Sequence, residues 1–98
     1  VNLYRLRYVS LVNDLLHALA ETQDYACVQH YALNAIDLMA GNLKAHYWLV
    51  VSTYHLGSIA LAKNELLRAK EILTSEEYTI LEDYLRKSEV VSWEKLIK

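Results

Sequence analysis

The chain has 98 residues, close to the size of one small domain, and its formal net charge is only −2. Its basic residues are spread among acidic neighbours, which is a poor footprint for direct nucleic-acid binding. Charged residues also interrupt every apolar run well before the roughly 18 residues that a membrane-spanning helix needs. Proline is absent and glycine occurs only twice, so the composition predicts an all-α fold.

The first expected helix covers about residues 3–20. Apolar side chains recur there at helical spacing, which indicates one face that packs against the rest of the protein. This stripe consists of Leu3, Leu6, Val9, Val12, Leu15, Leu16 and Leu19. After a turn at residues 21–23, Asp24 predicts the start of a second helix that runs to about residue 39, because its carboxylate can accept from free backbone N–H groups.

The next two expected helices repeat this pattern. Gly41 breaks the chain, and we expect it to adopt the left-handed backbone of a helix end, while Asn42 caps a third helix over residues 43–56. Gly57 ends that helix. Ser58 is expected to start a fourth helix, which continues to about residue 73.

The C-terminal quarter predicts a fifth helix and an amphipathic tail. Thr74 and Glu77 have the spacing of a capping box, so a helix over about residues 75–87 should cap the preceding pair. Residues 89–97 also have a helical apolar pattern, but they are too few to form a stable helix unless they dock. Two interpretations remain: a sixth helix packed on the fifth, or docking on a partner or on a second copy.

Residues 9–42 and 43–76 are two copies of one pattern with a period of about 34 residues. Asp24 corresponds to Ser58 and Ala35 to Ala69, so the caps and the small packing residues recur together. A helical hairpin cannot bury its apolar face by itself, and stacked hairpins usually hold other proteins. The sequence therefore predicts one helical-repeat domain over residues 1–98.

Several residues carry a resemblance to known repeats. The segment 42–49, followed by Tyr54, Gly57 and Ala62, resembles tetratricopeptide repeats. More narrowly, the Ala45-His46 pair, with the opening segment 6–8 and the segment 35–38, is similar to the bacterial transcriptional activator domain. That family lies C-terminal to a winged-helix DNA-binding domain in regulators of the Streptomyces antibiotic regulatory type. Gln23 stands where these repeats usually have glycine.

The resemblance implies a right-handed α-α superhelix and a regulatory function. It implies the non-catalytic effector domain of a longer bacterial transcription regulator, with DNA bound only through a separate N-terminal domain. The implied protein partners are that DNA-binding domain, the transcription machinery or a second copy in a homodimer. The alternative is a generic adaptor that binds a partner protein or peptide on its concave face.

In such a stack the first helix of each hairpin lines the concave side. Aromatic side chains at helical spacing there would offer a large contact area with polar ends. The candidate partner-binding residues are Asn13, His17, Glu21, Lys44, Tyr47, Val51, Tyr54 and His55. The competing interpretation is that the tyrosines among them pack inward.

The sequence has no complete set of residues for a metal site or for a catalytic cysteine. His17 with Glu21, and Cys27 with His30, could each place two metal ligands on one helix face, but neither pair has a neighbouring second pair. Cys27 lacks the oxyanion hole and orienting group that a nucleophile needs. We therefore expect no enzyme activity, metal or cofactor, and the single cysteine suggests a cytoplasmic location.

Overall fold

The computed structural model describes residues 3–97, with side chains from Arg7 onward, and this part of the chain is all-α. Its six helices follow one another through short connections. They are α1 (Leu3–Glu21), α2 (Tyr25–Leu38), α3 (Leu43–His55), α4 (Ile59–Ile72), α5 (Ser75–Lys87) and α6 (Trp93–Ile97). Among residues 3–97 no helix combines the length and the apolarity that crossing a membrane would require.

Side-chain caps fix where four of these helices begin. Asp24, Asn42 and Ser58 each accept a hydrogen bond from the backbone N–H three residues later, at the starts of α2, α3 and α4. Thr74 does the same for α5, and Glu77 completes the capping box by accepting from the Thr74 N–H at 3.0 Å. These contacts confirm the predicted helix starts, because each cap satisfies a backbone donor that the helix leaves free.

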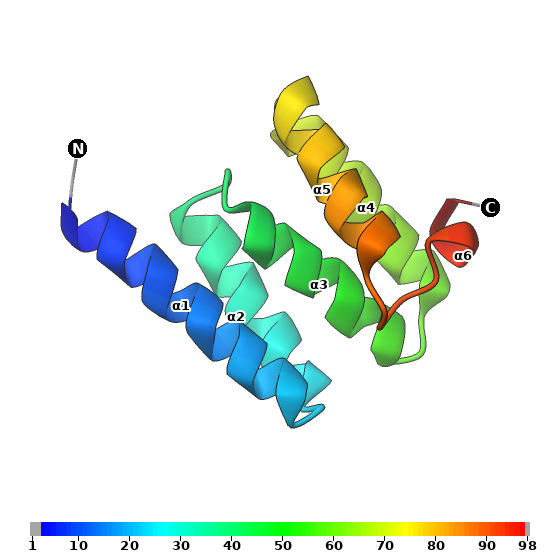
Figure 1. Ribbon diagram of the computed structural model, residues 1–98, viewed down its shortest axis with the longest axis horizontal. Helices are drawn as coiled ribbons and strands as arrows, with labels where there is room; N and C mark the ends of the chain where they lie inside the picture. Colours follow the sequence, from blue (N-terminus) through cyan, green and yellow to red (C-terminus); the bar gives the residue numbers. More distant parts are fainter. Residues whose placement is uncertain (1–2, 98) are drawn as a thin grey trace.

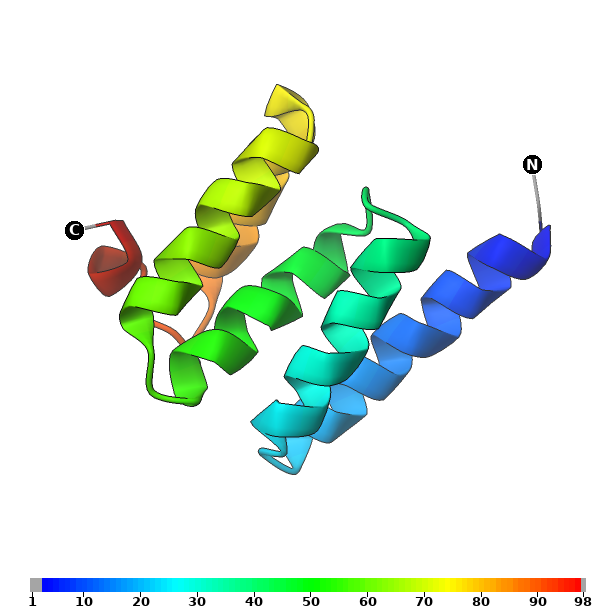
Figure 2. The ribbon, with the colours of Figure 1, turned by 180° about the vertical axis from the view of Figure 1, so that it is seen from behind.

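The helices form two layers. Helices α1, α3 and α5 lie side by side in front in Figure 1, with α2 and α4 behind them; Figure 2 shows the same layers from the other side. Helix α3 is central and contacts α1, α2, α4 and α5. The largest contacts join α3 to α2 and to α4, so consecutive antiparallel helices build the stack.

The apolar core has two parts, one on each side of α3. The first joins α1, α2 and α3 and consists of Leu16, Val28, Ala32, Ala35, Ala45 and Leu49. The second joins α3 to the C-terminal helices and includes Val50, Val51, Ala62, Leu66, Ala69, Leu81, Leu85 and Leu96. The alanines of both parts are buried at the helix contacts, where small side chains let neighbouring backbones approach closely.

The outer part of α1 differs from the sequence prediction. Of the expected apolar stripe Leu16 is fully buried, but Leu15 is 41% exposed. The side chains of Leu3 and Leu6 lie outside the described part. Leu15 is exposed because α1 is the first helix of the described stack and only one of its flanks meets α3.

The C-terminal tail folds back onto its own chain. Helix α6 begins at Trp93, later than the expected residue 89, and it packs against α4 and not mainly against α5. Val91 and Leu96 are buried in the second core, and the Arg86 guanidinium of α5 lies 5.6 Å from the centre of the Trp93 ring. Val91 thus enters the core from the linker that precedes the helix.

Two connections contain a left-handed backbone. Gly57 has φ of 98° just after α3, which it was expected to end, and Gln23 has φ of 61° in the turn before α2. The expectation for Gly41 is wrong, because among the described residues only Gln23 and Gly57 have positive φ. Gln23 therefore adopts a left-handed backbone conformation, which is strained for a residue with a side chain and costs least for glycine.

Gly57 and Gly41 should respond differently to alanine. Gly57→Ala is expected to lower the free energy of unfolding by about 1–2 kcal/mol, because a Cβ is disfavoured at its positive φ. Gly41→Ala is the control: its Cβ would meet the Glu77 Oε2 atom at 3.4 Å, an ordinary contact. Urea unfolding of both variants measures the difference, and equal losses would contradict the assignment of strain to Gly57.

Candidate partner-binding groove

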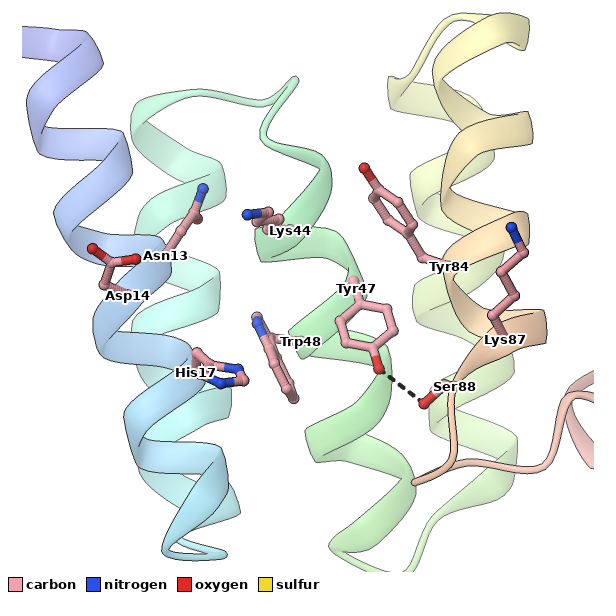
Figure 3. Close-up of a pocket in the computed structure, with 9 residues that line it drawn as sticks. All are labelled: Asn13, Asp14, His17, Lys44, Tyr47, Trp48, Tyr84, Lys87 and Ser88. Atoms are coloured by element: carbon pink, nitrogen blue, oxygen red, sulfur yellow. Dashed lines mark hydrogen bonds between the residues drawn. The ribbon is translucent and has the colours of Figure 1, made fainter.

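An open groove with a volume of about 670 Å³ lies across the layer of α1, α3 and α5 (Figure 3). Each of these helices contributes side chains, and Ser88, just after α5, also lines the groove. The lining residues are Asn13, Asp14, His17, Lys44, Tyr47, Trp48, Tyr84, Lys87 and Ser88.

Aromatic rings form the middle of the groove. The Tyr47 and Trp48 rings of α3 meet edge to face with centroids 4.8 Å apart, and Tyr84 of α5 approaches Tyr47 at 6.4 Å. On the α1 side the His17 ring lies 6.0 Å from Trp48. Rings in such contacts are rigid and have polar ends, so they offer a partner a large area at a low entropy cost.

Two hydrogen bonds hold the groove in shape. The Tyr47 hydroxyl and the Ser88 hydroxyl are 2.8 Å apart, which ties α3 to the end of α5 (Figure 3). The Asn42 Nδ2 group donates to Asn13 Oδ1 at 3.0 Å, while Asn42 Oδ1 accepts from the Ala45 N–H. Asn42 is buried, so its bond to Asn13 joins α1 to the start of α3.

Cationic groups lie along the groove, on α3 and α5. Lys44 is exposed at the start of α3. Lys87 Nζ lies 3.1 Å from Asp83 Oδ2, an exposed pair that contributes little and can exchange for another partner. Figure 3 shows the Asp14 carboxylate on the side of α1 away from α3 and the Lys87 ammonium on the side of α5 away from α3, so these two charges lie at the outer edges of the groove.

The sequence prediction located part of this groove. Asn13, His17, Lys44 and Tyr47 all line it. The expectation that Val51 is exposed is wrong, because its side chain is fully buried in the second core with Leu81 and Leu85. Val51 occupies the place in the second repeat that His17 occupies in the first, but α5 covers it.

Three further candidates lie outside the groove lining. The Glu21 carboxylate is 3.1 Å from His17 Nε2 at the exposed end of α1. His55 stacks on the Tyr25 ring at 4.4 Å and donates from Nε2 to the Val90 carbonyl, and Tyr54 packs against the second core. These last two side chains therefore hold elements together, as the inward-packing interpretation proposed for the tyrosine.

The sequence prediction missed five lining residues, which are Asp14, Trp48, Tyr84, Lys87 and Ser88. Two of them, Asp14 and Trp48, could have been found from the repeat. They directly follow the candidates Asn13 and Tyr47, which occupy equivalent positions in the two copies, so the repeat would have extended each candidate to the residue after it. Tyr84 and Lys87 were assigned to a helix treated only as a cap.

Other titratable groups have structural surroundings. His46 is buried and donates from Nε2 to the Ala40 carbonyl at 2.7 Å, which fastens the α2–α3 connection. A hydrogen bond with Asp24 raises the pKa of the Cys27 thiol, with smaller effects from desolvation and from the Asp24 charge. This direction disfavours the thiolate, the form that acts as a nucleophile or metal ligand. The described residues contain no cluster of three or more metal-ligating side chains.

Comparison with known proteins adds no identification. No protein-family model matches the chain, and the searches of curated proteins and of solved structures each gave no significant match.

Proposed function

We propose that this chain is a non-catalytic protein-interaction domain that binds a segment of a partner protein in the groove between α1, α3 and α5. The groove itself is the observation that carries the proposal. It places three aromatic rings and two lysines on the open side of one helical layer. Aromatic anchors beside polar groups are typical of protein-binding sites.

We also propose that the two hairpins stack in the manner of tetratricopeptide repeats, in a right-handed superhelix. Two features support this. The caps Asp24 and Ser58 occupy equivalent places in the two copies, and α3 contacts both its own hairpin partner α4 and the preceding helix α2. In such a stack the first helices share one face, which is the face that carries the groove.

The groove favours a segment with acidic and apolar side chains. Lys44 and Lys87 would meet carboxylates at its edges, while Trp48 and Tyr84 would meet apolar groups between them. A charge-assisted hydrogen bond to lysine is stronger than a neutral one, so acidic residues give the segment its orientation.

A displayed library of random peptides, selected on the wild-type chain, tests this function. Selected peptides should be enriched in acidic and apolar residues. Tyr84→Ala should weaken their binding at least about tenfold, because truncating a central aromatic anchor removes much of the contact energy. Fluorescence anisotropy with labelled peptides gives the affinities.

Tyr31→Ala is the matched control. Tyr31 is 41% exposed and Tyr84 40%, but Tyr31 lies on α2 outside the groove lining. Its replacement should leave peptide affinity unchanged. A library that yields no binding peptide, or peptides that bind the Tyr84→Ala variant as tightly as wild type, would refute the proposal.

A narrower proposal is that this domain is the effector part of a bacterial transcription regulator. It rests on the resemblance at Ala45 and His46, both of which are buried at the α2–α3 junction. The coding sequence upstream of Val1 tests it directly. A basic winged-helix domain there would support the regulator, whereas further helical hairpins would favour a generic adaptor.

A further inference from the structure

A second surface, separate from the aromatic part of the groove, lies on the outer flank of the first hairpin. Tyr8, Leu11 and Leu15 form an exposed apolar stripe along α1, which we call the α1 stripe. Leu11 is 62% exposed. Leu11 and Asn13 are two residues apart, so they point to nearly opposite sides of the helix, and Asn13 faces α3.

Helix α2 continues this surface. Tyr31 and Leu38 are exposed and lie on the flank of α2 opposite Gln29, whose Nε2 group donates to Thr53 Oγ1 of α3. The apolar side chains of both helices therefore gather at the end of the stack that is remote from α3. A contiguous apolar surface of this kind indicates a contact site.

The repeat shows that these positions are normally covered. Leu11 corresponds to Ala45 in the second copy and Leu15 to Leu49, and both of those are buried where α2 packs on α3. On α1 the equivalent positions hold leucines that the rest of residues 3–97 leaves 62% exposed at Leu11 and 41% exposed at Leu15. A helix laid along the α1 stripe would bury them as α2 buries Ala45 and Leu49.

The charges beside the α1 stripe select a second copy of the same helix. Arg7 and Asp14 are seven residues, nearly two turns, apart, so they lie along one edge of the stripe with Leu11 between them. Both side chains are exposed, and neither forms an ion pair with another described residue. Figure 3 shows the Asp14 carboxylate on the side of α1 that points away from α3.

We infer that two copies of this protein dimerise through α1, with the two helices antiparallel and crossing near Leu11. A two-fold axis at that point places Leu11 against the partner's Leu11 and Tyr8 against the partner's Leu15. The same axis keeps equal edges of the helices adjacent, so Arg7 lies beside the partner's Asp14, twice in each dimer. Self-complementary contacts of this kind are the usual route to homodimers.

Sedimentation equilibrium of the full chain between about 1 μM and about 1 mM tests the dimer. The wild-type mass should rise from one chain of 11.3 kDa toward two chains. Leu11→Asp should raise the dimer dissociation constant at least about tenfold, because two like charges would meet at the centre of an apolar contact. A wild-type protein that stays monomeric over this range overturns the proposal and leaves the stripe to another partner.

Leu67→Asp is the matched control, because Leu67 is 58% exposed but lies on α4. Its dimer dissociation constant should equal that of the wild type, and circular dichroism should show that both variants stay helical. A loss of dimer as large as that of Leu11→Asp would place the contact elsewhere and overturn the assignment.

A charge exchange tests the antiparallel arrangement. Arg7→Glu and Asp14→Arg should each weaken the homodimer, since like charges then face each other. An equimolar mixture of the two variants should dimerise again, because both pairs across the axis become complementary. Failure of the mixture to recover dimer would rule out this arrangement. Arg7→Glu leaves every groove-lining residue unchanged, whereas Asp14 lines the groove, so peptide binding in the groove is measured on the Arg7→Glu variant.

Discussion

Replacing Leu81 by alanine should lower the free energy of unfolding by about 2–5 kcal/mol. Leu81 is fully buried in the second core, where α5 meets α3 and α4. The truncation removes apolar contacts and leaves a cavity that the surrounding helices cannot fill completely. Chemical denaturation followed by circular dichroism measures the loss.

Ile80→Ala provides the control on the same helix. Ile80 is exposed, so its truncation should cost less than about 1 kcal/mol. If both variants lose the same stability, α5 does not pack on the core through Leu81. If neither loses stability, the helix makes no contribution to the fold.

Asn42→Ala should cost about 2–4 kcal/mol, more than the loss of an ordinary cap. Two interactions disappear together: the cap on the Ala45 N–H and the donor to Asn13 Oδ1. Because Asn42 is buried, no other side chain takes its place in these two bonds, and the Asn13 Oδ1 acceptor is left without its partner. The same denaturation experiment measures this change.

Ser58→Ala shows how much stability the loss of a cap alone costs, without the loss of a bond between helices. Ser58 caps α4 by accepting from the Leu61 N–H, and removing that cap should cost about 1 kcal/mol. A double-mutant cycle of Asn13→Ala with Asn42→Ala then isolates the bond between α1 and α3. A coupling energy near zero would contradict the role of this bond in holding the groove.

The local rules of the sequence predicted the helices well, and contacts explain where they failed. The capping residues Asp24, Asn42, Ser58 and Thr74 located the starts of α2 to α5, because a cap acts on the backbone within one turn. The period of the repeat located which helices share a face. It did not show which positions on that face are covered, because coverage depends on the neighbouring helix.

Val51 and Leu11 show that limit from opposite sides. Val51 was expected at the binding surface, but α5 buries it, whereas its equivalent His17 on the end helix stays exposed. Leu11 occupies a position that is buried in the second repeat, yet no helix among the described residues packs on the outer flank of α1, where Leu11 is 62% exposed. Periodicity defines equivalent positions, and only the packing distinguishes a central helix from an end helix.

The C-terminal residues of the groove were missed for a related reason. Helix α5 begins at its own capping box, and its start lies closer to that of α3 than a full repeat would place it. The register of the repeat therefore does not extend to Tyr84 and Lys87. Their place in the groove follows from how α5 packs on α3, which no local pattern in the sequence specifies.

The linker between α5 and α6 contacts the groove at its start and leads to the last helix. Ser88 at its start bonds to Tyr47 in the groove, and the Val90 carbonyl in its middle bonds to His55 at the end of the same helix, α3. Val91 then enters the second core. The Tyr47–Ser88 and His55–Val90 hydrogen bonds both hold this linker against α3. A ligand that draws the Tyr47 hydroxyl away from Ser88 would remove the first of them. The same hydroxyl group therefore lies on a residue that lines the groove and anchors the chain that leads to the last helix.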